Sequence, residues 1–317
     1  MKILVTPTSF KPDSDSPAMR TLKSFADELV FNPYGRPLGE DELADLLTGC
    51  DGMIAGVDFL SEKAIMSADR LKVISRYGVG YDRVDIAAAR KKGIAVTNTP
   101  GANSKAVAEL AFGLMLSLAR RIPMLDRKTK ASEWAQYTGT ELGGKTLGIL
   151  GLGAVGRLVA KQAVGFAMHV VAYDPYMDAA YAEQNGIGAV SLEEVIASSD
   201  FISLHLPLKN DTRHLIDTKS ISRMKDGAVI INTARGGIID EEAVLAALEA
   251  GKIGGLGLDA YEQEPPERSK LFEMDNVVMT PHAAAHTREA TENMANASVA
   301  NLIAVLSGQE CSAIVNK

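Results

Sequence analysis

Short apolar runs alternate with longer stretches of mixed apolar and polar residues along nearly the whole chain. The short runs have the length of buried strands, and the longer stretches have apolar positions at helical spacing. Strands that alternate with helices assemble into parallel sheets covered by helices on both faces. The pattern therefore predicts an α/β fold built on doubly wound parallel sheets.

The first third of the chain predicts a small α/β unit of its own. Its apolar runs predict strands at residues 2–7, 52–56, 72–77 and 95–99, and a candidate helix lies at 40–48. Pro100 and Gly101 then indicate a turn before a long helix over residues 104–120. We interpret this turn as a domain boundary.

From residue 145 the alternation resumes and predicts six further strands. They correspond to the segments KTLGILG, HVVAYD, FISLHLP, GAVIINTA, GGLGLDAY and NVVMTPH. Six parallel strands are sufficient for a complete dinucleotide-binding sheet. The final helical stretch, residues 287–306, is too long to be only a cap on that sheet, so we expect it to return to the first domain.

Composition narrows the possible classes of protein. The chain has 317 residues, of which 46% are hydrophobic and 23% charged, and this length suggests two domains. Its net charge of −7 and the absence of a basic cluster argue against a nucleic-acid partner. No apolar run reaches the roughly 18 residues of a membrane helix, and the N-terminal segment lacks a signal-peptide core. We therefore expect a cytoplasmic protein without a membrane partner.

The two cysteines, Cys50 and Cys311, form no CxxC pair and have no histidine at ligand spacing. A disulfide framework and a metal site are accordingly not predicted.

A glycine motif follows the first strand of the second unit. Gly151, Gly153 and Gly156 have the spacing GxGxxG, in which the first permits a tight turn, the second lets a pyrophosphate approach, and the third lets helix pack on strand. The motif alone is weak, because glycines in ordinary turns also produce it. However, Asp174 lies 23 positions after Gly151 at the end of an apolar run, close to the roughly 20 expected for a carboxylate that binds the adenosine ribose.

Asp174 also bears on the choice of coenzyme. A 2′-phosphate would lie against its carboxylate, and two like charges at 4 Å repel by about 4 kcal/mol at an effective dielectric of 20. Pro175 and Tyr176, which follow, provide no arginine to hold a phosphate. The sequence therefore predicts NAD as cofactor in preference to NADP.

Three residues after predicted strands are candidates for chemistry. Arg235 follows GAVIINTA and could hold a carboxylate by two parallel hydrogen bonds. His282 ends NVVMTPH and is the natural acid/base candidate. Glu264 lies in a loop after GGLGLDAY, and a carboxylate beside an imidazole stabilises its protonated form. Taken singly, each has a plainer interpretation: a surface arginine, a structural histidine and a solvated loop acid.

The motifs GLGAVG, Asp174, ARGG, DAYEQEPP and TPH occur in one order, and with RYGVGYDRVD and TNTPGANSKAVAEL they extend over nearly the whole chain. In this order they resemble the D-isomer-specific 2-hydroxyacid dehydrogenase family, with the phosphoglycerate dehydrogenase branch as the nearest fit. The resemblance implies two domains: a substrate domain of residues 1–101 plus 288–317 and an inserted NAD-binding domain of residues 102–287. It also implies an active site in the cleft between them.

The resemblance assigns roles residue by residue. It implies that Arg235, Glu264 and His282 are catalytic, and that the loop amides of Val79 and Gly80 receive the substrate carboxylate. The cofactor contacts that it implies are Gly151, Gly153, Ala154, Val155, Gly156, Asp174, Pro207, Thr212, Ala234, Asp259 and Ala284. The implied reaction is hydride transfer between the nicotinamide of NAD and C2 of a 2-hydroxy or 2-oxo acid.

The substrate itself is left open by the sequence. Phosphoglycerate dehydrogenases commonly have an arginine and a serine where this chain has Ala55 to Asp58, so that phosphate contact is missing. Arg76, or Arg36 from another direction, could hold a phosphate instead, although either could equally be a solvated surface arginine. 3-Phosphoglycerate therefore stays a candidate beside glyoxylate or hydroxypyruvate.

Two further alternatives and one assembly expectation follow from the resemblance. An NAD-sensing binding protein of the corepressor type shares this fold and its catalytic residues. Formate dehydrogenase is a second relative, but it pairs its histidine with glutamine, and Glu264 argues against it. The family's dimer contact corresponds to the helix at 104–120, which is apolar nearly all round, so we expect a homodimer. A core helix of a monomer is the alternative interpretation of that apolar helix.

Overall fold

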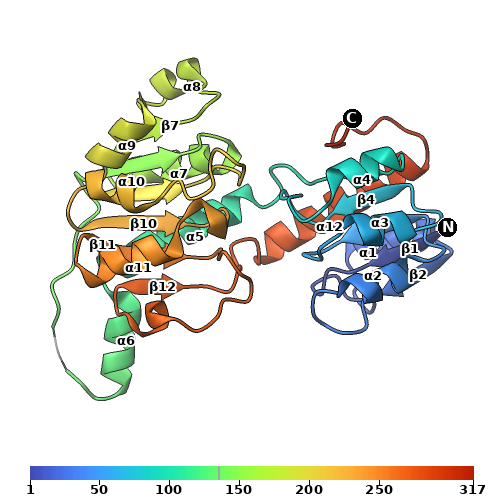
Figure 1. The fold of residues 1–317 in the computed structure, drawn as a ribbon, viewed down its shortest axis with the longest axis horizontal. Helices are drawn as coiled ribbons and strands as arrows, with labels where there is room; N and C mark the ends of the chain where they lie inside the picture. Colours follow the sequence, from blue (N-terminus) through green and yellow to red (C-terminus); the bar gives the residue numbers. More distant parts are fainter. Residues whose placement is uncertain (135) are drawn as a thin grey trace. The chain divides into compact units, whose positions relative to one another are not determined.

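A computed structural model describes residues 1–134 and 136–317. The chain forms two compact units: unit 1 contains residues 1–103 and 286–317, and unit 2 contains residues 104–285 (Figure 1). These junctions lie two residues from the positions at 101/102 and 287/288 inferred from the sequence. Because unit 1 contains both ends of the chain, unit 2 is an insertion within it.

Unit 1, whose residues are all described, contains a five-stranded parallel sheet in the order β2-β1-β3-β4-β5. The strands are β1 (Lys2–Val5), β2 (Glu28–Phe31), β3 (Gly52–Ala55), β4 (Val73–Arg76) and β5 (Ala95–Thr97). This is the flavodoxin-like order. The sequence did not lead us to predict β2, a half-exposed edge strand that begins with Glu28 and has only three apolar residues.

Helices cover both faces of the unit 1 sheet. They are α1 (Pro17–Phe25), α2 (Glu40–Leu47), α3 (Glu62–Ser67), α4 (Ile86–Lys91) and α12 (Arg288–Leu306). One core contains the apolar faces of α2, α3 and α4, and the other contains those of α1 and α12. The helix expected to return to the first domain is α12, which begins after the N-cap Thr287 and contacts β3 and β4.

The described residues of unit 2 contain a seven-stranded parallel sheet in the order β12-β11-β10-β9-β6-β7-β8. The strands are β6 (Thr146–Leu150), β7 (His169–Tyr173), β8 (Gly188–Ala189), β9 (Phe201–Leu204), β10 (Ala228–Asn232), β11 (Ile253–Leu258) and β12 (Val277–Met279). Six of them match the predicted segments. The seventh, β8, has two residues, which is too short to give a periodic signal. The strand order reverses between β6 and β9, where dinucleotide sheets bind their ligand.

Helices also cover both faces of the unit 2 sheet. They are α5 (Ser104–Ala119), α7 (Ala154–Gly165), α8 (Ala179–Gln184), α9 (Leu192–Ser198), α10 (Thr218–Arg223) and α11 (Glu241–Glu249). A further helix, α6 (Ile122–Lys130), packs against α5. One core packs α9, α10 and α11 on the sheet, and the other packs α5 and α7 on the opposite face. The predicted doubly wound α/β fold is therefore confirmed in both units. Within the described part of the chain, no helix combines the length and apolarity needed to cross a membrane.

The last residues of the chain complete the edge of the unit 1 sheet. The Asn316 side chain donates a hydrogen bond to the Ile94 carbonyl at 2.8 Å and accepts one from the Val96 amide at 2.8 Å. The Val315 amide also donates to the carbonyl of Val96 at 2.8 Å. Asn316 is buried, so its amide replaces the water that an edge strand would otherwise bind.

Replacing Asn316 by alanine should therefore leave two buried main-chain groups without partners. We expect Asn316→Ala to lower the free energy of unfolding by about 2 kcal/mol and to accelerate hydrogen exchange at the Val96 amide. Urea denaturation and native-state exchange measure these effects. Gln309→Ala, at an exposed position near the same terminus, is the matched control, and equal stability of the two variants would contradict the assignment.

Candidate active site

The residues singled out in unit 2 follow the carboxyl ends of its parallel strands. The glycine turn follows β6, Asp174 follows β7, and Pro207 follows β9. Arg235, Glu264 and His282 come after β10, β11 and β12 respectively, which are consecutive neighbours in the sheet. The edge of the sheet at which the strands end therefore carries all of these residues. The cofactor candidates follow β6, β7 and β9, and the catalytic candidates follow β10, β11 and β12.

The three glycines of the turn meet different constraints. Gly151 has a φ of +103°, and a Cβ there would lie 2.7 Å from the carbonyl carbon of His205. A Cβ on Gly156 would lie 2.0 Å from the carbonyl oxygen of Gly151, so only glycine lets helix α7 approach the turn this closely. Beside Gly153, by contrast, the position is open. A phosphate can approach Gly153 at the N-terminus of α7, where the first-turn amides lack helical partners.

Asp174 is bound to the glycine turn itself. Its carboxylate accepts the Leu152 amide at 2.8 Å and the Tyr176 amide at 2.8 Å. A carboxylate has further lone pairs, so ribose hydroxyls can still donate to it. The open position at Gly153 and the carboxylate of Asp174 together fit a dinucleotide.

The residues directly after Asp174 contain no cation, but helix α7 carries Arg157, which contacts the same glycine turn as Asp174. Arg157 donates to the Leu152 carbonyl at 3.1 Å and pairs with Asp178 at 2.9 Å. Its guanidinium also lies 3.9 Å from the ring centroid of Tyr181. Contacts across helix and loop are not readable from local sequence spacing, and the partner carboxylate of Asp178 offsets this positive charge.

Glu264 and His282 lie together. Nδ1 of His282 is 2.7 Å from Oε1 of Glu264, and the Tyr261 amide donates to the same oxygen at 3.3 Å. A carboxylate only accepts hydrogen bonds, so Nδ1 carries the proton. Nε2 is then the ring atom that can exchange a proton with a substrate.

Asp259 holds His282 in an unusual backbone conformation. His282 has a φ of +50°, in the left-handed region. Asp259, almost wholly buried, accepts the Ala283 amide at 2.7 Å, the Ala284 amide at 3.0 Å and the Thr280 hydroxyl at 2.6 Å. These three bonds fix the turn on both sides of His282. The resemblance named Asp259 only as a cofactor contact, a role that stays a prediction, as it does for Ala284.

Asn232 organises the segment of Arg235. Its buried side chain accepts the Ala234 amide at 3.1 Å and donates to the Arg235 carbonyl at 2.8 Å. The guanidinium of Arg235 donates to the carbonyl of Ala234 at 2.8 Å. The sequence analysis missed Asn232, although an amide at the end of an otherwise apolar strand is a detectable signal.

Pro207 and Thr212 belong to one closed turn after β9. The Thr212 hydroxyl donates to the Pro207 carbonyl at 2.7 Å and accepts the Lys209 amide at 2.8 Å. This geometry gives both residues a structural role, and their cofactor contacts stay predictions.

In unit 1, two carbonyls of the loop after β4 accept hydrogen bonds from the segment after β5. The Gly78 carbonyl accepts the Thr99 amide at 3.0 Å, and the Val79 carbonyl accepts the Asn98 side chain at 2.8 Å. In a trans peptide the carbonyl and the next amide point in opposite directions. The amides of Val79 and Gly80 therefore point away from these bonds, and such a pair can receive a small anion.

Arg76 supports this loop from within unit 1. It is buried rather than solvated, and its guanidinium donates to the Gly80 carbonyl at 2.9 Å and to the Ala55 carbonyl at 2.6 Å. Arg36, the other candidate phosphate partner, is exposed and forms two bonds to Glu42 at 2.7 and 2.9 Å.

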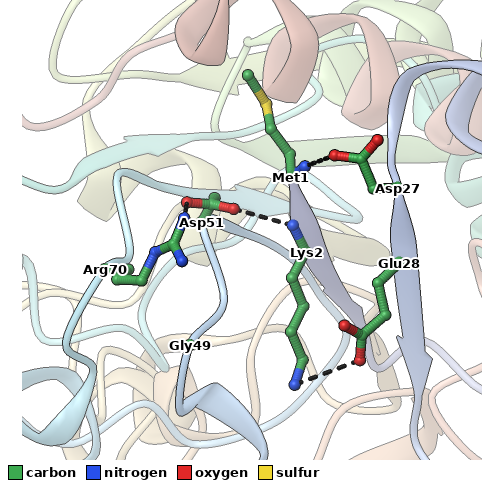
Figure 2. Close-up of a pocket in the computed structure, with 7 residues that line it drawn as sticks. All are labelled: Met1, Lys2, Asp27, Glu28, Gly49, Asp51 and Arg70. Carbon is green, nitrogen blue, oxygen red and sulfur yellow. Dashed lines mark hydrogen bonds and ion pairs between the residues drawn. The ribbon is translucent and has the colours of Figure 1, made fainter.

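A charged pocket of about 230 Å³ lies at the opposite end of the unit 1 strands (Figure 2). Ion pairs of Met1 with Asp27, of Lys2 with Glu28 at 3.4 Å and of Arg70 with Asp51 at 2.8 Å balance its charges internally. It therefore offers no unbalanced charge to a ligand.

The sheets, the glycine turn and the paired acid and histidine define a dinucleotide-binding protein of the dehydrogenase type. Comparison with known proteins identifies the family within this class. Residues 112–284 match the family described as D-isomer specific 2-hydroxyacid dehydrogenase, NAD binding domain. This chain belongs to that family, as the sequence analysis predicted.

Individual relatives and a solved structure show the same similarity. The chain is 40% identical over 305 residues to a glyoxylate reductase of Thermococcus litoralis, covering 93% of this chain and 92% of that protein. It is 42% identical over 284 residues to a D-3-phosphoglycerate dehydrogenase of Methanocaldococcus jannaschii, covering 88% of this chain but 54% of the relative, so it spans about half of that protein. A D-lactate dehydrogenase from Aquifex aeolicus, solved with NAD and lactic acid, superposes with a TM-score of 0.84 at 32% identity over 96% of each chain.

His205 lies next to the glycine turn and provides a pH-dependent contribution to stability. Its Nε2 is 2.8 Å from the buried hydroxyl of Ser203, and burial lowers the pKa of His205 from 6.5 to about 4. The unfolded chain therefore binds a proton between pH 6.5 and pH 4 that the folded chain does not bind. The contribution of neutral His205 to the free energy of unfolding is complete above pH 6.5 and is lost as the pH falls toward 4.

We expect the free energy of unfolding to fall by up to roughly 3 kcal/mol over this window through His205 alone. His205→Gln, which keeps a polar group near Ser203, should flatten the profile. Urea unfolding at several pH values from 7 to 4.5 measures both slopes, and equal slopes for the two proteins would contradict the burial of a neutral imidazole.

Proposed function

We propose that this chain is an NAD-dependent oxidoreductase that interconverts a D-2-hydroxy acid and the corresponding 2-oxo acid. The observation that carries the proposal is the contact of 2.7 Å between His282 and Glu264. This pair lies on the sheet edge that also bears Arg235 and the glycine turn. The family membership and the named activities of the relatives support the same reaction class.

Each catalytic residue has a role suited to its position. The guanidinium of Arg235 binds the substrate carboxylate and polarises the 2-oxo group. Nε2 of His282 donates a proton to that oxygen during reduction and accepts it during oxidation. Glu264 orients the ring by accepting the hydrogen bond from Nδ1. NAD, when bound, supplies or accepts the hydride at the substrate C2.

The cofactor would be held by the turn from Gly151 to Gly156 and by Asp174. The first-turn amides of α7, including those of Ala154 and Val155, favour the pyrophosphate, and Asp174 favours the ribose hydroxyls over a 2′-phosphate. The amides of Val79 and Gly80 in unit 1 would receive the substrate carboxylate, as the family resemblance implies.

Contacts within unit 1 favour an unphosphorylated substrate. The loop after β3 carries Asp58, which is buried and accepts the Leu38 amide at 2.9 Å and the Thr6 hydroxyl. A carboxylate there disfavours a nearby phosphate. Arg76 and Arg36, the two candidate phosphate partners, are engaged by main-chain carbonyls and by Glu42. A small 2-oxo acid such as glyoxylate or hydroxypyruvate is therefore the favoured substrate.

3-Phosphoglycerate is the second candidate, since the M. jannaschii relative carries that activity in its name. Initial rates with glyoxylate, hydroxypyruvate, pyruvate and 3-phosphohydroxypyruvate, each with NADH and NADPH, separate the possibilities. We expect the fastest turnover with an unphosphorylated acid and NADH. Preference for the phosphorylated acid would select the second candidate, and binding of NADH without turnover of any acid would favour a corepressor-like protein.

Replacement of His282 is the most direct mutational test. His282→Ala should lower kcat at least about 100-fold, because proton transfer by a positioned side chain contributes 10²- to 10⁴-fold. NADH affinity, measured by fluorescence titration, should change little. His286→Ala, four positions further on, is the control. Turnover near the wild-type rate in His282→Ala would refute the assignment.

We also propose that the chain is a cytoplasmic homodimer. The apolar character of α5 is largely explained by its packing on β10, β11 and α7, so it supports a dimer less than the sequence suggested. Exposed apolar side chains on neighbouring segments, Ile122 at 50% and Trp134 at 89%, favour a partner surface. Sedimentation velocity at micromolar concentration should give twice the monomer mass of 33.7 kDa, and a monomer would contradict it.

A further inference from the structure

Two segments that carry catalytic candidates pack backbone to backbone in unit 2. A Cβ on Gly236, the residue after Arg235, would lie 1.8 Å from the carbonyl carbon of Tyr261 and 2.2 Å from the amide nitrogen of Glu262. No side chain fits in that space. The position of the Tyr261–Glu262 peptide therefore decides how the loop leading to Glu264 meets the segment of Arg235.

Glu241 holds that peptide from helix α11. It is the first residue of the helix, and its Oε1 accepts the amide of Glu262 at 2.8 Å. The N-cap of α11 is Asp240, whose side chain accepts the Ala243 amide at 3.0 Å. The carboxylate of Glu241 is thus directed to the loop, while its neighbour caps the helix.

The environment of Glu241 is that of a partly enclosed acid. Burial raises the pKa of the Glu241 carboxyl, the negative charge of Glu262 raises it further, and the hydrogen bond from the Glu262 amide lowers it. The next residue, Glu242, is exposed. Two adjacent glutamates on one helix therefore differ in burial and in contact with the loop.

His214 makes a second contact with the residues of this peptide. Nε2 of His214 lies 2.7 Å from Oε1 of Glu262. The backbone of His214, with a φ of +51°, donates to the Gly237 carbonyl at 2.8 Å. Glu241, Glu262 and His214 thereby link the loop before Glu264 to the segment after Arg235.

We propose that Glu241 is a positioning residue for the catalytic pair: by holding the Glu262 amide, it places Glu264 against His282. This inference rests on the proposed function for its catalytic meaning. The placement itself is a property of the folded chain. Glu264 lies two residues beyond the Tyr261–Glu262 peptide. Its Oε1 accepts hydrogen bonds from Nδ1 of His282 and from the Tyr261 amide.

The first test measures the placement without turnover. A proton shared between His282 Nδ1 and the Glu264 carboxylate gives a downfield NMR signal, identified by its loss in His282→Ala. Glu241→Ala should weaken or shift this signal, whereas Glu241→Gln, which keeps the acceptor oxygen, and the control Glu242→Ala should retain it. If Glu241→Ala does not fold, Glu241→Asp replaces it in the comparison. Aspartate is shorter by one methylene, so its carboxylate lies farther from the Glu262 amide.

The second test measures catalysis on the best acid of the substrate panel. Glu241→Ala should lower kcat between about 10-fold and 100-fold with unchanged affinity for NADH, and should shift the pH profile of kcat in the same direction as Glu264→Gln, measured beside it. If Glu241 acts through Glu264, adding Glu241→Ala to Glu264→Gln should cause little further loss. Glu241→Gln should recover most of the activity.

The outcomes separate the two proposals. An unchanged Nδ1 signal in a folded Glu241→Ala or Glu241→Asp protein, or fully additive losses in the double variant, overturns the positioning role. Absence of turnover by the wild-type chain on every acid refutes the proposed function, while the NMR comparison still decides whether Glu241 places the pair.

Discussion

Parallel pairing of β10, β11 and β12 is the constraint on which the candidate active site depends. Parallel strands end at the same edge of a sheet, so segments far apart in the sequence emerge side by side. Arg235, Glu264 and His282 follow three neighbouring strands of this kind. The same order places the glycine turn and Asp174 on the other half of that edge, after β6 and β7.

Close backbone approaches convert this arrangement into a defined geometry. Gly156 lets α7 meet the glycine turn, and Gly236 lets the segment of Arg235 meet the loop before Glu264. Buried polar side chains then fix the loops: Asp259 holds the turn of His282, and Asn232 holds the segment of Arg235. Most of these bonds join side chain to backbone, which suits loops that must hold a functional group in one place.

Much of the fold was predictable because buried parallel strands are nearly continuous apolar runs. The exceptions were β2, which begins with Glu28 and has only three apolar residues, and the two-residue β8. Motif residues of the site were also predictable, since Gly151, Asp174, Arg235, Glu264 and His282 each follow a recognisable strand. Glu241 and His214 were not predictable, because they contact segments far away in the sequence, which no local spacing encodes. Asn232 contacts residues two and three positions ahead, and the amide that ends its apolar strand was a signal that could have been used. Arg76 illustrates the same limit, because its burial among main-chain carbonyls depends on the packing of unit 1.

We propose that this chain transfers hydride between a nicotinamide and C2 of a D-2-hydroxy acid. Reduction of a 2-oxo acid with NADH deuterated at C4, followed by NMR and chiral analysis of the product, follows that hydride. One deuterium is expected at C2 of the D-hydroxy acid when the transferred position carries the label. A product of the L configuration, or one that takes its C2 hydrogen from solvent with either face of the coenzyme labelled, would contradict it.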